Sequence, residues 1–202
     1  MMKFFTLHLI AFCICSFAAV ERSSCTSTEE EDEVPTLADL MKMVSTREKI
    51  WMTMRTYDNP RRDCIYWLNN GLNTTDYDFF YWERRLPRPS SWNSGVAGKT
   101  HKHAKIGYLD EVPFPAMVIR AHYEKEEHAR VYLLLYWLES EKCFILLHPD
   151  GECEQYTWES MTSGRHECNK VFYDTCGAWH YPVFKPSCLD PKALCIKFNS
   201  LC

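Results

Sequence analysis

Eight short segments rich in β-branched and aromatic residues follow one another along the chain, and this run constrains the fold more than any other feature. Polar turn signals such as Asn59-Pro60, Asn69-Asn70-Gly71 and Pro149-Asp150-Gly151 separate most of the segments. The spacing is that of hairpins, without the long crossovers that parallel strands need. The pattern therefore predicts eight antiparallel strands, at residues 50–57, 64–68, 77–82, 95–106, 116–123, 130–138, 143–148 and 153–158.

A helical pattern lies on each side of the strands. Thr36 can cap the first helix with Asp39 in the capping-box position, and an apolar stripe follows, formed by Leu37, Leu40, Met41 and Val44. The second helix is predicted at residues 163–176, with Gly177 as its stop, and a short extended segment follows. This order favours a mainly β fold, an up-and-down antiparallel barrel with a helix on its wall and room inside for one small ligand. An eight-stranded sandwich is the alternative.

The chain opens with a segment typical of a secretory signal peptide, residues 1–18, in which Lys3 precedes an apolar run of about 14 residues. That run is too short to cross a bilayer, and no later stretch is long and apolar enough, so we expect a secreted protein with no membrane partner. An acidic segment at residues 19–35, predicted to be flexible, follows the leader. The barrel domain is placed at residues 36–188 and a cysteine-containing tail at residues 189–202.

Export makes disulfides the expected state of the cysteines that remain after the leader. Two of the 11 cysteines, Cys13 and Cys15, leave with the leader. The other nine are an odd number, so at least one thiol is free or pairs between chains. These nine are Cys25, Cys64, Cys143, Cys153, Cys168, Cys176, Cys188, Cys195 and Cys202. Asn73-Thr74-Thr75 is a glycosylation sequon in a predicted loop, which suits an exported protein.

Composition and motifs argue against several classes of function. The formal charge is −4 and the chain has no basic stripe, which argues against nucleic acid as a partner. No nucleophile elbow, phosphate loop or paired-carboxylate motif appears, so we predict neither an enzyme nor a cofactor. His101 and His103 are spaced as metal ligands can be, but Lys99 and Lys105 on the same strand face indicate a wetted outer surface. No metal site is therefore predicted.

Several short motifs, taken with their order and spacing, resemble those of the tick salivary lipocalins, the histamine-binding-protein family. The resemblance covers essentially the whole chain after the leader. The motifs are Ile50–Tyr57, Arg62-Asp63-Cys64, Lys142-Cys143, Gly151-Glu152-Cys153-Glu154, Glu167-Cys168 and Val183–Cys188. The resemblance implies a secreted barrel that sequesters mediators of the host response, and we expect it to act as a monomer. The ligands of such proteins are histamine or serotonin, leukotrienes or fatty acids in some members, and complement proteins in others.

The resemblance also implies a disulfide scheme. It supplies the pairs Cys64–Cys188 and Cys143–Cys168. A third pair, Cys153–Cys176, would join the last barrel strand to the wall helix. The pairing of the remaining cysteines stays open.

The motif positions of the amine-binding members are only partly kept. Their Asp-Ala-Trp motif on the first helix is Leu37-Ala38-Asp39 here, and their acid after the cysteine of the seventh strand is Phe144. Their Glu-Leu-Trp motif in the eighth strand becomes Glu154-Gln155-Tyr156, which keeps the acid and an aromatic ring. The resemblance therefore implies one pocket carboxylate where those members have more.

Strand alternation indicates which side chains would contact a ligand. If Cys153 points outward to the wall helix, then Glu154, Tyr156 and Trp158 point inward, and the same parity turns Phe144 inward. Tyr57 occupies the family position of a pocket tyrosine, with plain core packing as the alternative. Glu154 could bind a ligand ammonium, aided by the neighbouring rings; the alternative is an internal ion pair or a protonated carboxyl.

These residues predict a sequestrant of one biogenic amine, such as histamine or serotonin. Phe144 removes a charge and adds apolar lining, which suits a fatty acid or eicosanoid, so a lipid mediator is the alternative ligand. A protein-binding inhibitor of complement, which uses loops at the barrel mouth and holds no small ligand, is the third hypothesis.

Overall fold

A computed structural model of the chain describes residues 34–86 and 96–190. The predicted leader, most of the acidic segment and most of the C-terminal tail lie outside these residues, as do Cys25, Cys195 and Cys202. None of the helices in the described part is long and apolar enough to span a membrane.

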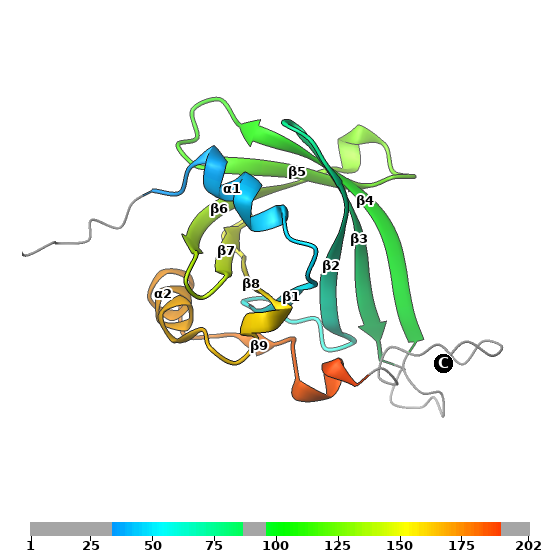
Figure 1. The fold of residues 1–202 in the computed structure, drawn as a ribbon, viewed down its shortest axis with the longest axis vertical. Helices are drawn as coiled ribbons and strands as arrows, with labels where there is room; N and C mark the ends of the chain where they lie inside the picture. The colour runs from blue at the N-terminus through cyan, green and yellow to red at the C-terminus, as the bar shows by residue number, and fades with distance from the viewer. Residues whose placement is uncertain (1–33, 87–95, 191–202) are drawn as a thin grey trace, which may run out of the picture. The chain divides into compact units, whose positions relative to one another are not determined.

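Eight antiparallel strands form a closed barrel (Figure 1). Each strand pairs with its neighbour in the chain, and β1 also pairs with β8, which joins the two ends of the sheet. The strands are β1 (Ile50–Arg55), β2 (Arg62–Leu72), β3 (Asp76–Arg85), β4 (Val96–Tyr108), β5 (Pro115–Ala121), β6 (Arg130–Leu138), β7 (Cys143–Leu147) and β8 (Cys153–Trp158). The predicted mainly β barrel is therefore confirmed, and the sandwich is not.

The turn predicted at Asn69-Asn70-Gly71 is wrong. β2 continues through these residues to Leu72, with an irregularity in its pairing to β3 between Asn69 and Gly71. The chain reverses afterwards, where the Asn73 side chain accepts hydrogen bonds from the backbone N–H groups of Thr75 (2.9 Å) and Asp76 (2.8 Å). A glycine in a strand pattern can mark a bulge as well as a turn. Here β2 stays paired with β3 up to Leu72, so Gly71 lies in a bulge and not in a turn.

The first helix, α1 (Leu37–Val44), begins with the predicted capping box. The Asp39 N–H donates to the Thr36 hydroxyl (3.2 Å), and the Asp39 carboxylate accepts from the Thr36 N–H (2.8 Å). Leu40, Met43 and Val44 are fully buried in the main core, which fills one end of the barrel interior. α1 lies across one end of the barrel in Figure 1 and so closes that end with apolar side chains.

The second helix, α2 (His166–Cys176), packs on the outside of the barrel beside β7 (Figure 1). It begins three residues later than predicted because the preceding residues form a turn, in which the Gly164 N–H bonds the Met161 carbonyl (3.3 Å). It ends at Gly177, whose φ of 91° is the left-handed conformation that glycine adopts without strain. The helix covers a second core of outward-facing side chains, which includes Met54, Ile145 and Phe172.

Three disulfides tie the outer segments to the barrel, and they are the pairs expected from the sequence. Cys143–Cys168 and Cys153–Cys176 hold α2 against β7 and β8. Cys64–Cys188 holds the C-terminal segment against β2, where Trp51, Tyr66 and Phe184 pack around it. That segment contains β9 (Tyr181–Pro182), which pairs with β1, and the 3₁₀ turn η3 (Pro186–Leu189). Two further 3₁₀ turns are η1 (Glu126–His128) and η2 (Glu159–Met161).

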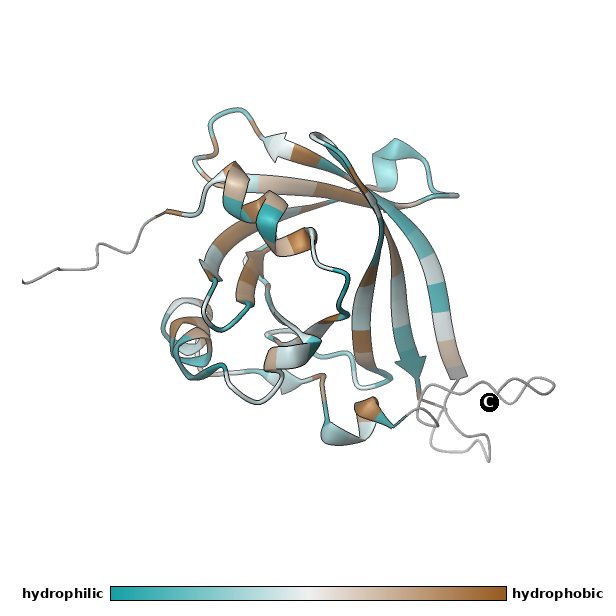
Figure 2. Cartoon of the chain, viewed as in Figure 1, coloured by the Kyte–Doolittle hydropathy of each residue, from teal (hydrophilic) through white to brown (hydrophobic). Residues whose placement is uncertain are grey.

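Coverage of the barrel wall differs between its two sides. All six residues of β1 are buried, because its outer face lies under the C-terminal segment and α2. β3 alternates between buried and more exposed residues in its N-terminal half, so its outer face meets solvent. Figure 2 shows the corresponding hydrophobic and hydrophilic bands along the strands. The outer faces of β3 and β4 are therefore free to carry polar side chains.

Removing the Cys64–Cys188 bridge is expected to lower the free energy of unfolding more than removing Cys143–Cys168. The two bridges span 124 and 25 positions. In the chain-entropy model such loops correspond to about 5 and about 3.5 kcal/mol, respectively. Urea titration of the two double Cys→Ala variants checks the order, and equal or inverted losses would contradict it.

Candidate ligand-binding cavity

The barrel contains a cavity of about 640 Å³. This volume falls within the roughly 300–1,000 Å³ of ordinary small-molecule sites. Its most buried walls are apolar or aromatic and come from β1, β2, β3, β5 and β8: Met52, Ile65, Trp67, Phe79, Ile119 and Tyr156. The cavity therefore has an apolar and aromatic inner wall, at the end that α1 and the main core close, and polar or charged side chains elsewhere.

Glu154 lies in the cavity wall and is buried with 2% of its surface exposed. Its carboxylate accepts hydrogen bonds from the hydroxyls of Tyr57 and Tyr156, the latter at 2.5 Å. The Nε2 atom of His148 lies 3.4 Å from Glu154 Oε1. The polar needs of this carboxylate are thus met by the protein.

The surroundings of Glu154 keep it ionised. Burial alone would raise its pKa, but the nearby His148 and the two tyrosine hydroxyls lower the pKa below its ordinary value of 4.5. Burial and the Glu154 charge raise the pKa of Tyr57 and Tyr156, so both remain neutral donors. Glu154 is therefore an ionised carboxylate whose hydrogen-bond partners come from the protein itself.

Basic residues outnumber acidic ones around the cavity. Three glutamates line it: Glu83, Glu124 and Glu154. Six basic residues line it: Arg55, Arg62, Lys102, Arg120, Arg130 and Arg85. Glu83 pairs with Arg62 (3.0 Å) and Arg85 (2.6 Å), which neutralises part of the rim. Arg55 and Lys102 have fewer such partners.

Arg55 is a buried cation with unsatisfied donors. Only 3% of its surface is exposed, and its Nη2 atom donates to the carbonyls of Asn59 (2.5 Å) and Arg62 (3.0 Å). Its Nε and Nη1 atoms are buried and have no hydrogen-bond acceptor in the described part of the chain. Buried polar atoms without partners are rare, and they often mark a place where a further group binds.

Lys102 is the second inner cation. Its Nζ atom lies 4.2 Å from the centre of the Tyr81 ring, and no carboxylate of the described residues is within ion-pair distance. Desolvation inside the barrel lowers the pKa of Lys102. An anion beside it would reverse that shift and stabilise the ammonium.

Three of the five residues predicted to contact a ligand line the cavity: Tyr57, Glu154 and Tyr156. Phe144 and Trp158 face inward as alternation predicted, but the cavity ends short of them. Phe144 stacks behind Tyr156 (ring centres 5.2 Å apart), and the Trp158 indole N–H donates to the Met43 carbonyl (3.1 Å). Both are correctly oriented core residues at the depth of α1, so neither is kept in the candidate site.

A β-bulge explains why alternation alone does not find Arg55. The register between β1 and β8 shifts between Met52 and Met54, so Met54 pairs with outward-facing Gln155 and Arg55 pairs with Glu154. Strict alternation would have turned Arg55 outward. Lys102 did have a signal in the sequence, because the parity that turns His101 and His103 outward turns Lys102 inward.

Neutralising Glu154 is expected to change how stability depends on pH. Because the folded state lowers the pKa of Glu154, its ionised form stabilises the fold above the unfolded-state pKa, and this contribution is lost as the pH falls through the lower folded-state pKa. Wild type should therefore be more stable than Glu154→Gln near pH 7, with a difference that shrinks below about pH 4.5. Urea unfolding across this range tests it. A difference that does not change with pH would contradict the assignment.

Comparisons with known proteins place the fold. No protein-family model matches the sequence, and no curated protein is similar to it. Two solved structures have the same fold. Japanin from Rhipicephalus appendiculatus bound to cholesterol has a TM-score of 0.50 at 10% identity over 69% of this chain and 93% of its own. AM182 in complex with serotonin has a TM-score of 0.52 at 12% identity over 74% of this chain and 91% of its own.

The closed eight-stranded barrel with its wall helix is a lipocalin-type fold. The resemblance to the tick lipocalins that the sequence motifs indicated is confirmed at the level of the fold.

Proposed function

We propose that this chain is a ligand-binding lipocalin that sequesters an amphipathic carboxylate, such as a fatty acid or an eicosanoid. The observation that carries the proposal is buried Arg55, whose Nε and Nη1 atoms have no acceptor in the described chain. A ligand carboxylate supplies the charge and the acceptor atoms that a guanidinium fork binds best. Lys102, which has no carboxylate of the described residues within ion-pair distance, adds a second positive charge to the same cavity.

The charge balance of the cavity favours an anion over an ammonium. An amine would enter among basic residues that outnumber the acidic ones, and like charges raise the free energy of a buried cation. Its best partner, Glu154, already accepts hydrogen bonds from two tyrosines and lies beside His148. An amine would have to compete with these internal partners.

The apolar inner wall of the cavity suits the tail of such a ligand. Ile65, Trp67 and Phe79 are at most 2% exposed and line the cavity beyond the charged rim. A hydrocarbon tail gains about 25 cal/mol for each Å² of apolar surface that it removes from water. The ligand would therefore lie with its tail among these side chains and its carboxylate near Arg55 and Lys102.

A biogenic amine remains the second candidate, because Glu154 is an ionised carboxylate among aromatic rings. The rings of Trp67 and Tyr156 lie 4.4 Å apart beside it and could contact a cation. The two structural neighbours were solved with a sterol and with serotonin, so lipocalin folds of this kind hold both lipids and amines.

The setting that we propose follows from the disulfides and from the resemblance to tick salivary lipocalins. Three bridges suit an exported protein, as does the predicted leader. A secreted monomer of this kind would act by removing a host lipid mediator of inflammation from solution. It would act by binding and not by catalysis, and it would need no cofactor. Asn73, whose side chain is exposed in the turn before β3, remains a predicted glycosylation site.

Substituting Lys102 should weaken fatty-acid binding. Removing a charged partner corresponds to about 1.5–3 kcal/mol, so the Kd of Lys102→Gln for arachidonate should rise roughly ten- to hundredfold. Lys99→Gln is the matched control, because Lys99 lies on the outer face of the same strand over the Phe80 ring (3.7 Å). Calorimetric titration of both variants measures the effect. An unchanged Kd in Lys102→Gln would remove Lys102 from the site.

Glu154→Gln should separate the two candidate ligands. The variant removes the negative charge from the cavity, so arachidonate should bind at least as tightly as to wild type, whereas serotonin binding should weaken roughly tenfold or more. The same titrations, run near pH 7, measure both. Tight serotonin binding by wild type that is lost in this variant, with no fatty-acid binding, would establish the amine function instead. No binding of either ligand would favour a protein partner.

A further inference from the structure

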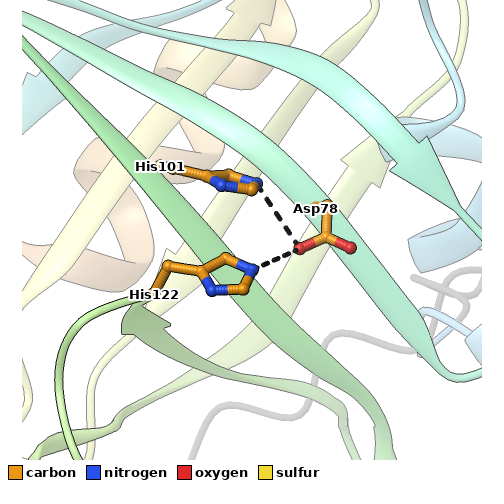
Figure 3. Close-up of side chains that lie close together, drawn as sticks. All are labelled: Asp78, His101 and His122. Carbon is orange, nitrogen blue, oxygen red and sulfur yellow. Dashed lines mark ion pairs between the residues drawn. The ribbon is translucent and has the colours of Figure 1, made fainter.

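Asp78, His101 and His122 meet on the outer face of the barrel, on the other side of the sheet from the cavity (Figure 3). They come from β3, β4 and the segment directly after β5. Strand alternation turns Phe79 of β3 and Lys102 of β4 into the barrel, whereas Asp78 and His101 point outward. The cluster is therefore separate from the proposed ligand site.

The ligand atoms of the three side chains are spaced as a metal ion requires. Asp78 Oδ1 lies 3.6 Å from His101 Nε2 and 3.8 Å from His122 Nε2, and all three ligand atoms lie within 4.8 Å of one another. Zinc bonds of about 2.0–2.2 Å in a tetrahedron place neighbouring ligand atoms roughly 3.3–3.5 Å apart. Small side-chain rotations would close the remaining difference.

An orphaned nitrogen points to a missing group at this cluster. His101 Nε2 is buried and has no hydrogen-bond partner in the described part of the chain. Its 3.6 Å separation from Asp78 is too long for a hydrogen bond. The His101 and His122 rings stack with their centres 4.3 Å apart, so both imidazoles lie at the same carboxylate. An ion among the three ligand atoms would satisfy the orphaned nitrogen.

His103 contacts the same carboxylate oxygen of Asp78 and can help to hold it in place. Its Nδ1 atom lies 3.2 Å from Asp78 Oδ1, and its Nε2 atom lies 3.2 Å from Asp76 Oδ1, which Lys105 also contacts at 2.5 Å. Metal ligands are commonly held in place by such outer partners. Arg120 of β5 lies opposite His103 in the strand register and donates to the Glu124 carbonyl (3.1 Å), and Lys99 of β4 lies over the Phe80 ring.

We propose that Asp78, His101 and His122 bind one Zn²⁺ ion, with water in the fourth position. Two imidazoles and one carboxylate suit zinc and similar divalent transition metals, whereas Mg²⁺ and Ca²⁺ prefer sites made of oxygen atoms. The ion would join β3, β4 and the end of β5. The sequence offered no third ligand beside His101 and His103. The fold brings two further candidates to His101, because Asp78 lies on the neighbouring strand β3 and His122 directly follows β5.

Zinc titration of the purified protein near pH 7.5 tests the site. One ion should bind per chain. His101→Ala and His122→Ala should each weaken zinc binding by at least about tenfold, because mutating a residue that only supports a metal ligand already lowers the affinity about that much. His166→Ala is the matched control, since His166 is exposed at the start of α2, and it should bind zinc as wild type does. Thermal unfolding without metal confirms that the variants are folded.

One further readout keeps the test specific. Co²⁺ substitution should give a spectrum without a thiolate charge-transfer band, which excludes binding to a cysteine. No stoichiometric zinc binding, a thiolate band, or unchanged affinity in His101→Ala would overturn the proposal. Lys102→Gln should leave zinc binding unchanged, so the zinc proposal and the ligand proposal can be tested separately.

Discussion

Closure of the sheet through β1 is the constraint on which the rest of the structure depends. β1 pairs with β8 on one side and with β2 on the other, so eight strands become one ring. In a closed ring, alternate side chains converge on a single interior, which must be filled by a core or left as a cavity. Here α1 and a large aromatic core fill one end, and the other end remains a cavity of about 640 Å³.

The closed wall also separates two kinds of polar chemistry. Inside, a buried charge needs a partner: Glu154 has tyrosine and histidine neighbours, whereas two donors of Arg55 have no acceptor among the described residues. Outside, β3 and β4 face solvent and present acids, histidines and lysines in cross-strand contact. One strand, β4, therefore contributes Lys102 to the ligand cavity and His101 to the candidate zinc site.

Much of the fold could be predicted from local patterns. Strand alternation and turn residues located all eight strands, and the ends of β6 and β8 agree with the prediction residue for residue. The orientation of Glu154 and Tyr156 followed from the outward position of Cys153. The prediction of a turn at Asn69-Asn70-Gly71 was wrong, because the same residue types can form a bulge when the strand continues beside a long partner strand.

The sequence by itself determined the class of the fold and the side of the sheet that most strand residues face, because period-2 patterning and helix capping are local properties. Tertiary structure decided the chemistry. A register shift in β1 turned Arg55 inward, and this buried cation is the basis for proposing a carboxylate ligand in place of an amine. The depth of the core removed Phe144 and Trp158 from the cavity. Asp78 and His122 join His101 only because strand pairing brings distant segments side by side, and no local pattern encodes that register.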